Sequence, residues 1–176
     1  SSSCWFSTVI FKIHDFLMVK NYKSLIFILL ITFLSSFIAG SITQLNIDPW
    51  YQSLNKLSFS PPNWIFGPVW TVLYAFMSIA IWVVYEKSKK SDLIFSKKIL
   101  RYYFYHLAIN LSWSFIFFYF HLIFFAFINI LVLIITIIFL MYLYFPRSKI
   151  SFILMVPYLL WIIFAAFLLY TTDAAN

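Results

Sequence analysis

The sequence predicts an all-α membrane protein, a bundle of five transmembrane helices. The chain has 176 residues, of which 64% are hydrophobic and only 10% are charged. A water-soluble domain of that composition would lack the polar side chains needed to cover its surface. The apolar residues form long continuous runs, whereas the strands of a membrane β-barrel alternate apolar and polar residues. A spanning helix needs about 20 mostly apolar residues, because the hydrocarbon core is about 30 Å thick.

The first two predicted spans cover residues 25–45 and 63–85. The first run is apolar apart from hydroxyl side chains and Gln44, and it ends before Asn46 and Asp48. The second run follows a pair of prolines and ends at Glu86.

The other three spans lie in residues 102–145 and 150–171. Residues 102–145 contain no charged side chain and are about twice as long as one span requires. We therefore expect a helical hairpin that reverses near residues 119–121. The last run lies between Lys149 and Asp173.

The basic residues predict the orientation in the membrane. Residues 86–101 contain six lysines and arginines, whereas residues 46–62 contain Lys56 against Asp48. Cytoplasmic loops carry the excess of basic residues, so the amino terminus is expected inside and the loop at 46–62 outside. The net charge of +7 then reflects membrane orientation, and no nucleic-acid partner is expected.

The predicted organisation is one membrane domain at 25–171, a short tail at 172–176 and a leader at 1–24. The leader does not have the pattern of a targeting peptide. Met18 is the expected native start, so the residues before it are expected to be peripheral or artefactual. Cys4 is the single cysteine, and it offers neither an internal disulfide nor a cysteine metal site.

The predicted spans contain no Asp, Glu, Lys or Arg between their ends, so they offer few titratable side chains for acid–base catalysis. On span three, His106, Asn110, Trp113 and Phe117 form one stripe at helical spacing. Two interpretations remain open. The stripe lines a ligand cavity, or its polar groups form hydrogen bonds between helices. An axial haem-ligand role for His106 is chemically allowed and ranks below both.

Residues 49–74, PWYQSLNKLSFSPPNWIFGPVWTVLY, join spans one and two. Pro61 and Pro62 stiffen the backbone, which predicts a rigid aromatic lid. Trp50 and Trp64 have a second interpretation, because tryptophan also concentrates at the lipid interface. Helical spacing further aligns Trp70 with Tyr74 on span two and Trp161 with Ala165 on span five, which taken alone indicates ordinary packing.

Three motifs follow one another in this sequence. The first combines W-Y-x-x-L-x-K, P-P-x-W and G-P-V-W-T-x-L-Y within residues 49–74, the second is HLAINLSWSFIFF at 106–118, and the third is PYLLWIIFAAFL at 157–168. In order and spacing they resemble the TspO/MBR family, the tryptophan-rich sensory proteins that include the mitochondrial translocator protein. The resemblance extends over about residues 25–170.

The resemblance implies a homodimeric membrane protein that binds a tetrapyrrole, such as protoporphyrin IX or haem, in a pocket enclosed by its five helices. Some members also bind sterols and benzodiazepine-site ligands. A flat, largely apolar porphyrin suits aromatic walls with few polar anchors. The residues expected to form the pocket are Trp50, Pro61, Pro62, Trp64, Trp70, Tyr74, His106, Asn110, Trp113, Phe117, Trp161 and Ala165.

The chain also departs from the family pattern. His106 stands where the family has glutamine, and Asn129 stands where it has aspartate. No lysine or arginine follows Tyr170, so the cholesterol-recognition pattern proposed for that position cannot be completed.

Three functions remain open at this point. We favour a ligand-binding sensor or regulator of tetrapyrrole metabolism over a transporter of porphyrin or small lipids. The third is an enzyme that degrades porphyrin with light and oxygen, for which Trp50 and Trp161 are the candidates. No metal and no required cofactor are expected. The abundance of Ile, Phe, Lys and Asn indicates an AT-rich genome, which favours a bacterial cell membrane over a mitochondrial outer membrane.

Overall fold

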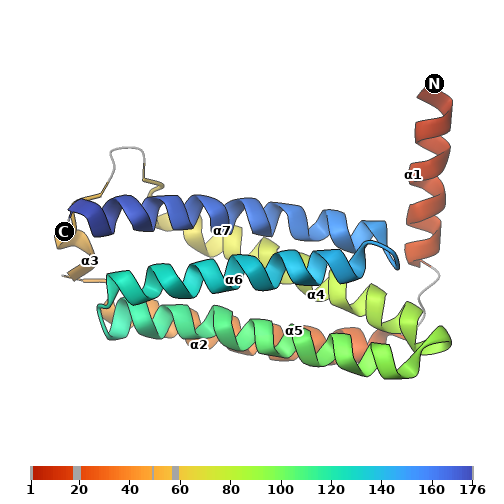
Figure 1. Cartoon of the computed structure of the whole chain (residues 1–176), viewed down its shortest axis with the longest axis horizontal. Helices are drawn as coiled ribbons and strands as arrows, with labels where there is room; N and C mark the ends of the chain where they lie inside the picture. Colours follow the sequence, from red (N-terminus) through yellow and green to blue (C-terminus); the bar gives the residue numbers. More distant parts are fainter. Residues whose placement is uncertain (1, 18–20, 49, 57–59, 176) are drawn as a thin grey trace.

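The computed structural model describes residues 2–17, 21–48, 50–56 and 60–175. Met18, the expected native start, lies outside the described residues. Five long helices lie side by side (Figure 1). They are α2 (Tyr22–Asn46), α4 (Phe66–Ser91), α5 (Leu93–Ser114), α6 (Ile123–Tyr144) and α7 (Lys149–Ala175). The predicted all-α five-helix membrane bundle is confirmed.

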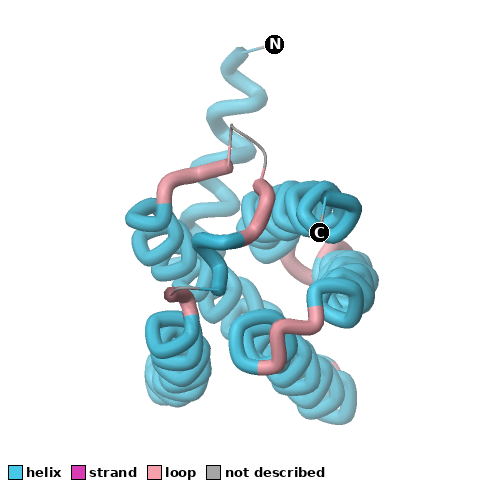
Figure 2. Tube along the Cα trace, turned by 90° about the vertical axis from the view of Figure 1, so that its left-hand side faces the viewer, coloured by secondary structure: helices cyan, strands magenta, loops and turns pink. Residues whose placement is uncertain are grey.

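The helices α4 and α5 lie at the centre of the bundle. The first packs against α2, α5 and α7, and the second packs against α2, α4 and α6. The contact between α6 and α7 closes the arrangement, which Figure 2 shows nearly end-on. Every long helix therefore has at least two neighbours among the other four.

Four helical segments of the described chain are long and apolar enough to cross a membrane, namely α2, residues 63–91, α6 and α7. The fifth, α5, carries Lys97, Lys98 and Arg101 near its start, which lowers its mean hydropathy. The remainder of α5 carries no charged residue and packs against α2, α4 and α6.

Four shorter elements complete the described structure. The helix α1 (Ser2–Leu17) stands apart from the bundle, beside the end where α4 meets α5 (Figure 1). At the opposite end lie α3 (Trp50–Ser53), the 3-10 turn η1 (Asn63–Ile65) and the π-helical turn η2 (Phe115–Tyr119). The residues expected to form a tail continue α7 as far as Ala175.

The connections between helices are short. Residues 86–101 were expected to be a loop, but they are helical on both sides of Asp92, whose carboxylate accepts a hydrogen bond from the Phe95 backbone nitrogen at 2.9 Å. This carboxylate caps the start of α5. The charged residues on either side of it can remain helical because they lie outside the hydrocarbon. The predicted hairpin is confirmed, because the chain reverses between η2 and α6 at residues 120–122. His121 adopts a φ of 58° in this reversal.

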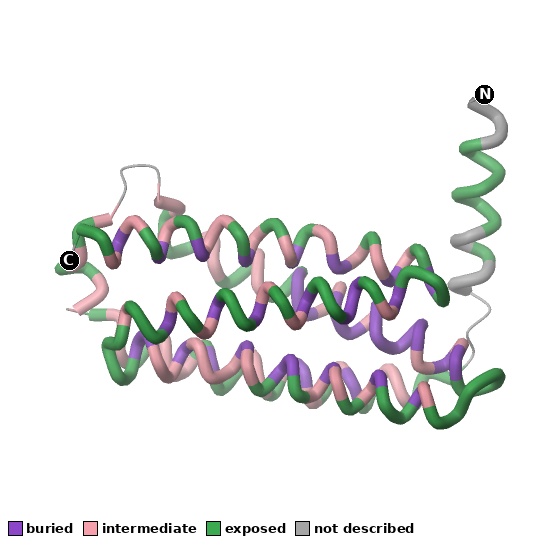
Figure 3. Tube along the Cα trace, in the orientation of Figure 1, coloured by how far each residue is buried: buried purple, intermediate pink, exposed green. Residues whose placement is uncertain are grey.

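Burial follows the positions of the helices. Purple buried segments concentrate on α4 and on the inward sides of its neighbours (Figure 3). Many large apolar residues of α2, α6 and α7 are exposed. A bilayer is the solvent that favours such an exterior.

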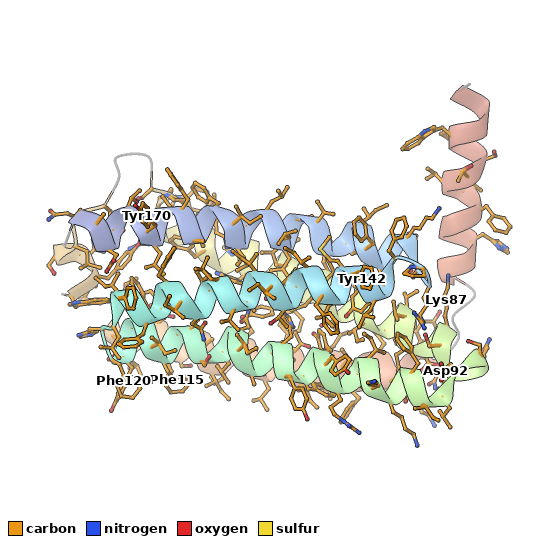
Figure 4. All side chains as sticks on the ribbon, in the orientation of Figure 1. Lys87, Asp92, Phe115, Phe120, Tyr142 and Tyr170 are labelled. Atoms are coloured by element: carbon orange, nitrogen blue, oxygen red, sulfur yellow. The ribbon has the colours of Figure 1, made fainter. Side chains whose placement is uncertain are left out.

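The two ends of the bundle differ in charge. Figure 4 labels Lys87 and Asp92 at one end and Phe115, Phe120 and Tyr170 at the other. The first, which we call the basic end, carries Lys23, Lys87, Lys89, Lys90, Lys97, Lys98, Arg101, Arg147 and Lys149 at the ends of its helices. Among the described residues, the other end carries Asp48, Lys56 and Asp173.

Candidate functional site

A cavity of about 380 Å³ lies in the end of the bundle opposite the basic end. All five long helices contribute to its wall, together with Tyr51 of α3 and residues of the segment that precedes α4. The cavity exists because the chain places small side chains here. The wall contributed by α2 contains Ser36, Ala39, Gly40 and Thr43, at the spacing of one helix face. A Cβ atom added to Gly40 would meet no atom within 4 Å, so no neighbouring helix fills this space.

The wall formed by α5 and η2 is aromatic. The Trp113 and Phe117 rings are stacked, with centroids 5.1 Å apart and an interplanar angle of 18°. Phe117 and Phe118 of the π-helical turn η2 both line the cavity. Wider π turns of this kind are often found at functional sites. Within the described chain, the indole nitrogen of Trp113 is buried and has no hydrogen-bond partner.

Aromatic residues of α4 and α7 form another part of the wall. Trp70 stacks on Tyr74 at 5.4 Å, and Trp161 meets the edge of Phe66 at 6.0 Å. Ala165 lies one helical turn beyond Trp161 and also lines the cavity. This arrangement leaves a mainly apolar space between aromatic walls.

A buried hydrogen-bond network joins α4, α5 and α7 at the cavity wall. The Tyr74 hydroxyl donates to Asn110 Oδ1 at 2.8 Å, and Asn110 Nδ2 donates to the Tyr158 hydroxyl at 2.7 Å. The same hydroxyl lies 2.7 Å from His106 Nε2. Which of these two atoms donates depends on the tautomer of His106, and either arrangement ties α5 to α7. His106 is therefore engaged in helix packing.

One cation lies on the cavity wall among the described residues. The Lys56 Nζ donates to the Tyr51 backbone carbonyl at 2.8 Å and lies 3.8 Å from the centroid of the Tyr51 ring. Desolvation by burial lowers the pKa of Lys56 below its usual 10.5, and burial raises the pKa of the Tyr51 phenol above 10.0. Tyr51 in turn packs against the rings of Phe117 and Phe118.

The structure brings most of the sequence-predicted residues together. Those that line the cavity are Pro61, Trp70, Tyr74, Asn110, Trp113, Phe117, Trp161 and Ala165. The other four lie outside the lining. His106 is fully buried beside Tyr158, Trp64 is 73% exposed, and Pro62 is exposed at the start of η1.

Trp50 lies behind the aromatic wall. Its ring stacks on His121 at 4.1 Å and meets the edge of Phe117 at 5.1 Å. The stack joins α3 to the turn between η2 and α6. Of the two tryptophans considered for photochemistry, Trp161 therefore lines the cavity and Trp50 does not.

Residues of the stripe on α5 divide between lining the cavity and forming hydrogen bonds between helices. Asn110 lines the cavity and bonds to two other helices, while Trp113 and Phe117 line it without such bonds. Asn129 of α6 donates to the Ser112 hydroxyl at 2.9 Å and links α6 to α5.

Several residues that line the cavity were not predicted from the sequence. The most informative are Tyr51 and Lys56, both of which lie within the motif W-Y-x-x-L-x-K. The presence of one lysine in an otherwise uncharged stretch was the signal that could have identified this position. The small residues of α2 carry no such signal, because small residues in membrane helices usually indicate close packing.

Comparisons with known proteins agree on one family. The TspO/MBR family profile matches residues 27–174. The tryptophan-rich protein TspO of Archaeoglobus fulgidus is 32% identical over 148 residues, which is 84% of this chain and 91% of that protein. The protein of the same name from Chlorobaculum tepidum is 30% identical over 140 residues, which is 80% of this chain and 87% of that protein. The tryptophan-rich sensory protein of Cereibacter sphaeroides is 33% identical over 135 residues, which is 76% of this chain and 82% of that protein.

Proposed function

The chain belongs to the TspO/MBR family, and from this premise we propose that it is a membrane-embedded sensor or regulator that binds a tetrapyrrole in the cavity. The observation that carries the proposal is the cavity itself, which is enclosed by five helices and walled by stacked aromatic side chains.

The chemistry of the wall supports a porphyrin as ligand. A macrocycle of this class is flat and largely apolar, so it gains most from apolar burial and from stacking on aromatic rings. It needs few polar anchors, and the cavity offers Asn110, Lys56 and the indole N–H of Trp113. The volume of about 380 Å³ falls in the lower part of the range of about 300–1,000 Å³ found for small-molecule sites. We therefore expect the apolar ring to lie inside and its polar edge to lie at the mouth.

We also propose an oligomeric state and a cellular membrane for this protein. The family resemblance supports a homodimer, and the prokaryotic origin of the relatives described above supports a bacterial cell membrane as the location. Both remain predictions.

A titration with protoporphyrin IX in a non-ionic detergent tests the proposed function. Binding is followed by quenching of tryptophan fluorescence and by the shift of the porphyrin absorbance. We expect saturable binding to the wild type and about tenfold weaker binding to Trp161→Ala, equivalent to about 1.4 kcal/mol. The matched control is Trp64→Ala, because Trp64 is exposed and lies outside the cavity lining.

Two results would contradict the proposal. The first is the absence of saturable binding by a wild type that is helical by circular dichroism. The second is equal weakening in both tryptophan variants, because a cavity ligand contacts only the first of these positions.

A further inference from the structure

Lys56 has an unusual position for a charged side chain. It lies on the wall of a mainly apolar cavity, and no other residue described in that wall carries a full charge at neutral pH. In the described part of the chain, no carboxylate lies within 4.0 Å of its nitrogen, and its partners are the carbonyl oxygen and the ring of Tyr51. Asp48 and Asp173 lie at the same end of the bundle, but neither lines the cavity.

The partners of Lys56 fix its position without neutralising its charge. An ammonium group has three hydrogen-bond donors, and the Tyr51 carbonyl accepts one of them. The Tyr51 ring is packed against Phe117 and Phe118, so the nitrogen is held on a surface that is itself part of the cavity wall. Two donors and one positive charge are left for a ligand.

Any ligand that fills the cavity must either cover this charge or pair with it. Covering an ammonium with an apolar group removes water from it, which costs free energy unless an opposite charge replaces the water. The lowering of the Lys56 pKa by desolvation indicates that part of this cost is already present before a ligand arrives. A ligand with a carboxylate at its edge would remove the cost and form a charge-assisted hydrogen bond.

We infer that Lys56 is a specificity-determining binding residue that pairs with a carboxylate of the tetrapyrrole, while the macrocycle lies between the aromatic walls. The inference rests on the proposed function and deepens it. The site selects macrocycles that carry free carboxylates, and it discriminates against the same macrocycles when their carboxylates are esterified.

The test compares protoporphyrin IX, which has two propionate groups, with its uncharged dimethyl ester. Both are titrated at neutral pH in a non-ionic detergent against the wild type, Lys56→Met, Lys56→Arg and the matched control Lys97→Met. The control removes an exposed lysine at the basic end, far from the cavity.

We expect the wild type and the control to bind the free acid about tenfold more tightly than the diester. Lys56→Met should lose this preference by binding the free acid less tightly, while its affinity for the diester changes by less than about twofold. Lys56→Arg keeps the charge and should keep the preference. Unchanged binding of the diester also shows that the variant is folded.

Three results would overturn the inference. Equal affinity of the wild type for the two macrocycles would show that no carboxylate is recognised. Equal loss of both ligands in Lys56→Met would show that Lys56 acts by holding Tyr51 in place. A wild type that binds neither macrocycle would contradict the proposed function itself and the assignment of Lys56 with it, whereas the first two results leave the proposed function intact.

Discussion

The hydroxyl of Tyr158 is the point at which the buried polar groups of α5 and α7 meet. It bonds to His106 and Asn110 at 2.7 Å each, and Asn110 extends the network to Tyr74 on α4. Polar groups in the interior of a membrane protein are costly when they have no partner, so this oxygen stabilises the contact of α5 with α7, and the Tyr74–Asn110 bond adds α4 to the network.

Replacement of Tyr158 by phenylalanine should therefore destabilise the protein. It leaves His106 Nε2 and Asn110 Nδ2 without their shared partner, and we expect a decrease of about 1–2 kcal/mol in the free energy of unfolding. Thermal unfolding in detergent, followed by circular dichroism, measures the loss. Tyr170→Phe, on the same helix but 59% exposed, is the control and should leave the unfolding temperature unchanged. An equal effect of the two substitutions would exclude the network as the cause.

At the scale of single residues, the sequence indicated which side chains of α5 belong to the site. It did not show which of them line the cavity and which join the helices. The stripe of His106, Asn110, Trp113 and Phe117 follows directly from helical spacing. Its division into packing and lining residues depends on Tyr158, which lies 52 residues beyond His106 in the chain. Spacing within one helix carries no information about a partner on another helix, so the two interpretations could not be separated without the structure.

The helices and their connections were the most predictable elements. Charged residues and prolines bound the apolar runs, and the double length of the run at 102–145 predicts the hairpin, whose reversal was expected near 119–121 and lies at 120–122. The ends of the helices were less predictable, because hydropathy reports where the chain can cross lipid and not where the helix stops. The helices α4 and α5 therefore continue through charged residues to Asp92. The π turn η2 has no recognised sequence pattern and was not predicted.

The arrangement of these elements predicts the orientation of the protein. The α4–α5 and α6–α7 connections lie at the basic end, and the segment between α2 and α4 lies at the other end (Figure 1). With basic residues in the cytoplasm, Ser91 should be inside and Ser53 outside. Ser53→Cys and Ser91→Cys, each in a Cys4→Ser background, can be labelled in intact cells with a membrane-impermeant maleimide.

We expect labelling of the cysteine at position 53 in intact cells and labelling at position 91 only after the cells are opened. Both serines are exposed, so each position is accessible to the reagent from its own side. The reverse pattern would show that the basic end faces outward, and it would contradict the predicted topology.

At the scale of the whole molecule, the bundle is divided into a close-packed half and a hollow half. The basic half is filled by large side chains such as Ile81, Ile99 and Met155, which are fully buried. In the other half, small residues on α2 and Ala165 on α7 leave the cavity open. With the predicted topology, the cavity lies toward the outer side of the membrane, and Lys56 lies at its outer edge. A larger side chain that fills the cavity should thus weaken the binding of the ligand without disturbing the close-packed half.

The affinity of an Ala165→Trp variant for protoporphyrin IX tests the central claim most directly, because the new indole would occupy the space assigned to the ligand. Ala108→Trp, which adds the same side chain at an exposed position of α5, is the control. With both variants folded as judged by circular dichroism, we predict that Ala165→Trp binds at least about tenfold more weakly than the wild type and that Ala108→Trp binds like the wild type. Wild-type affinity in Ala165→Trp would place the porphyrin elsewhere and contradict the account.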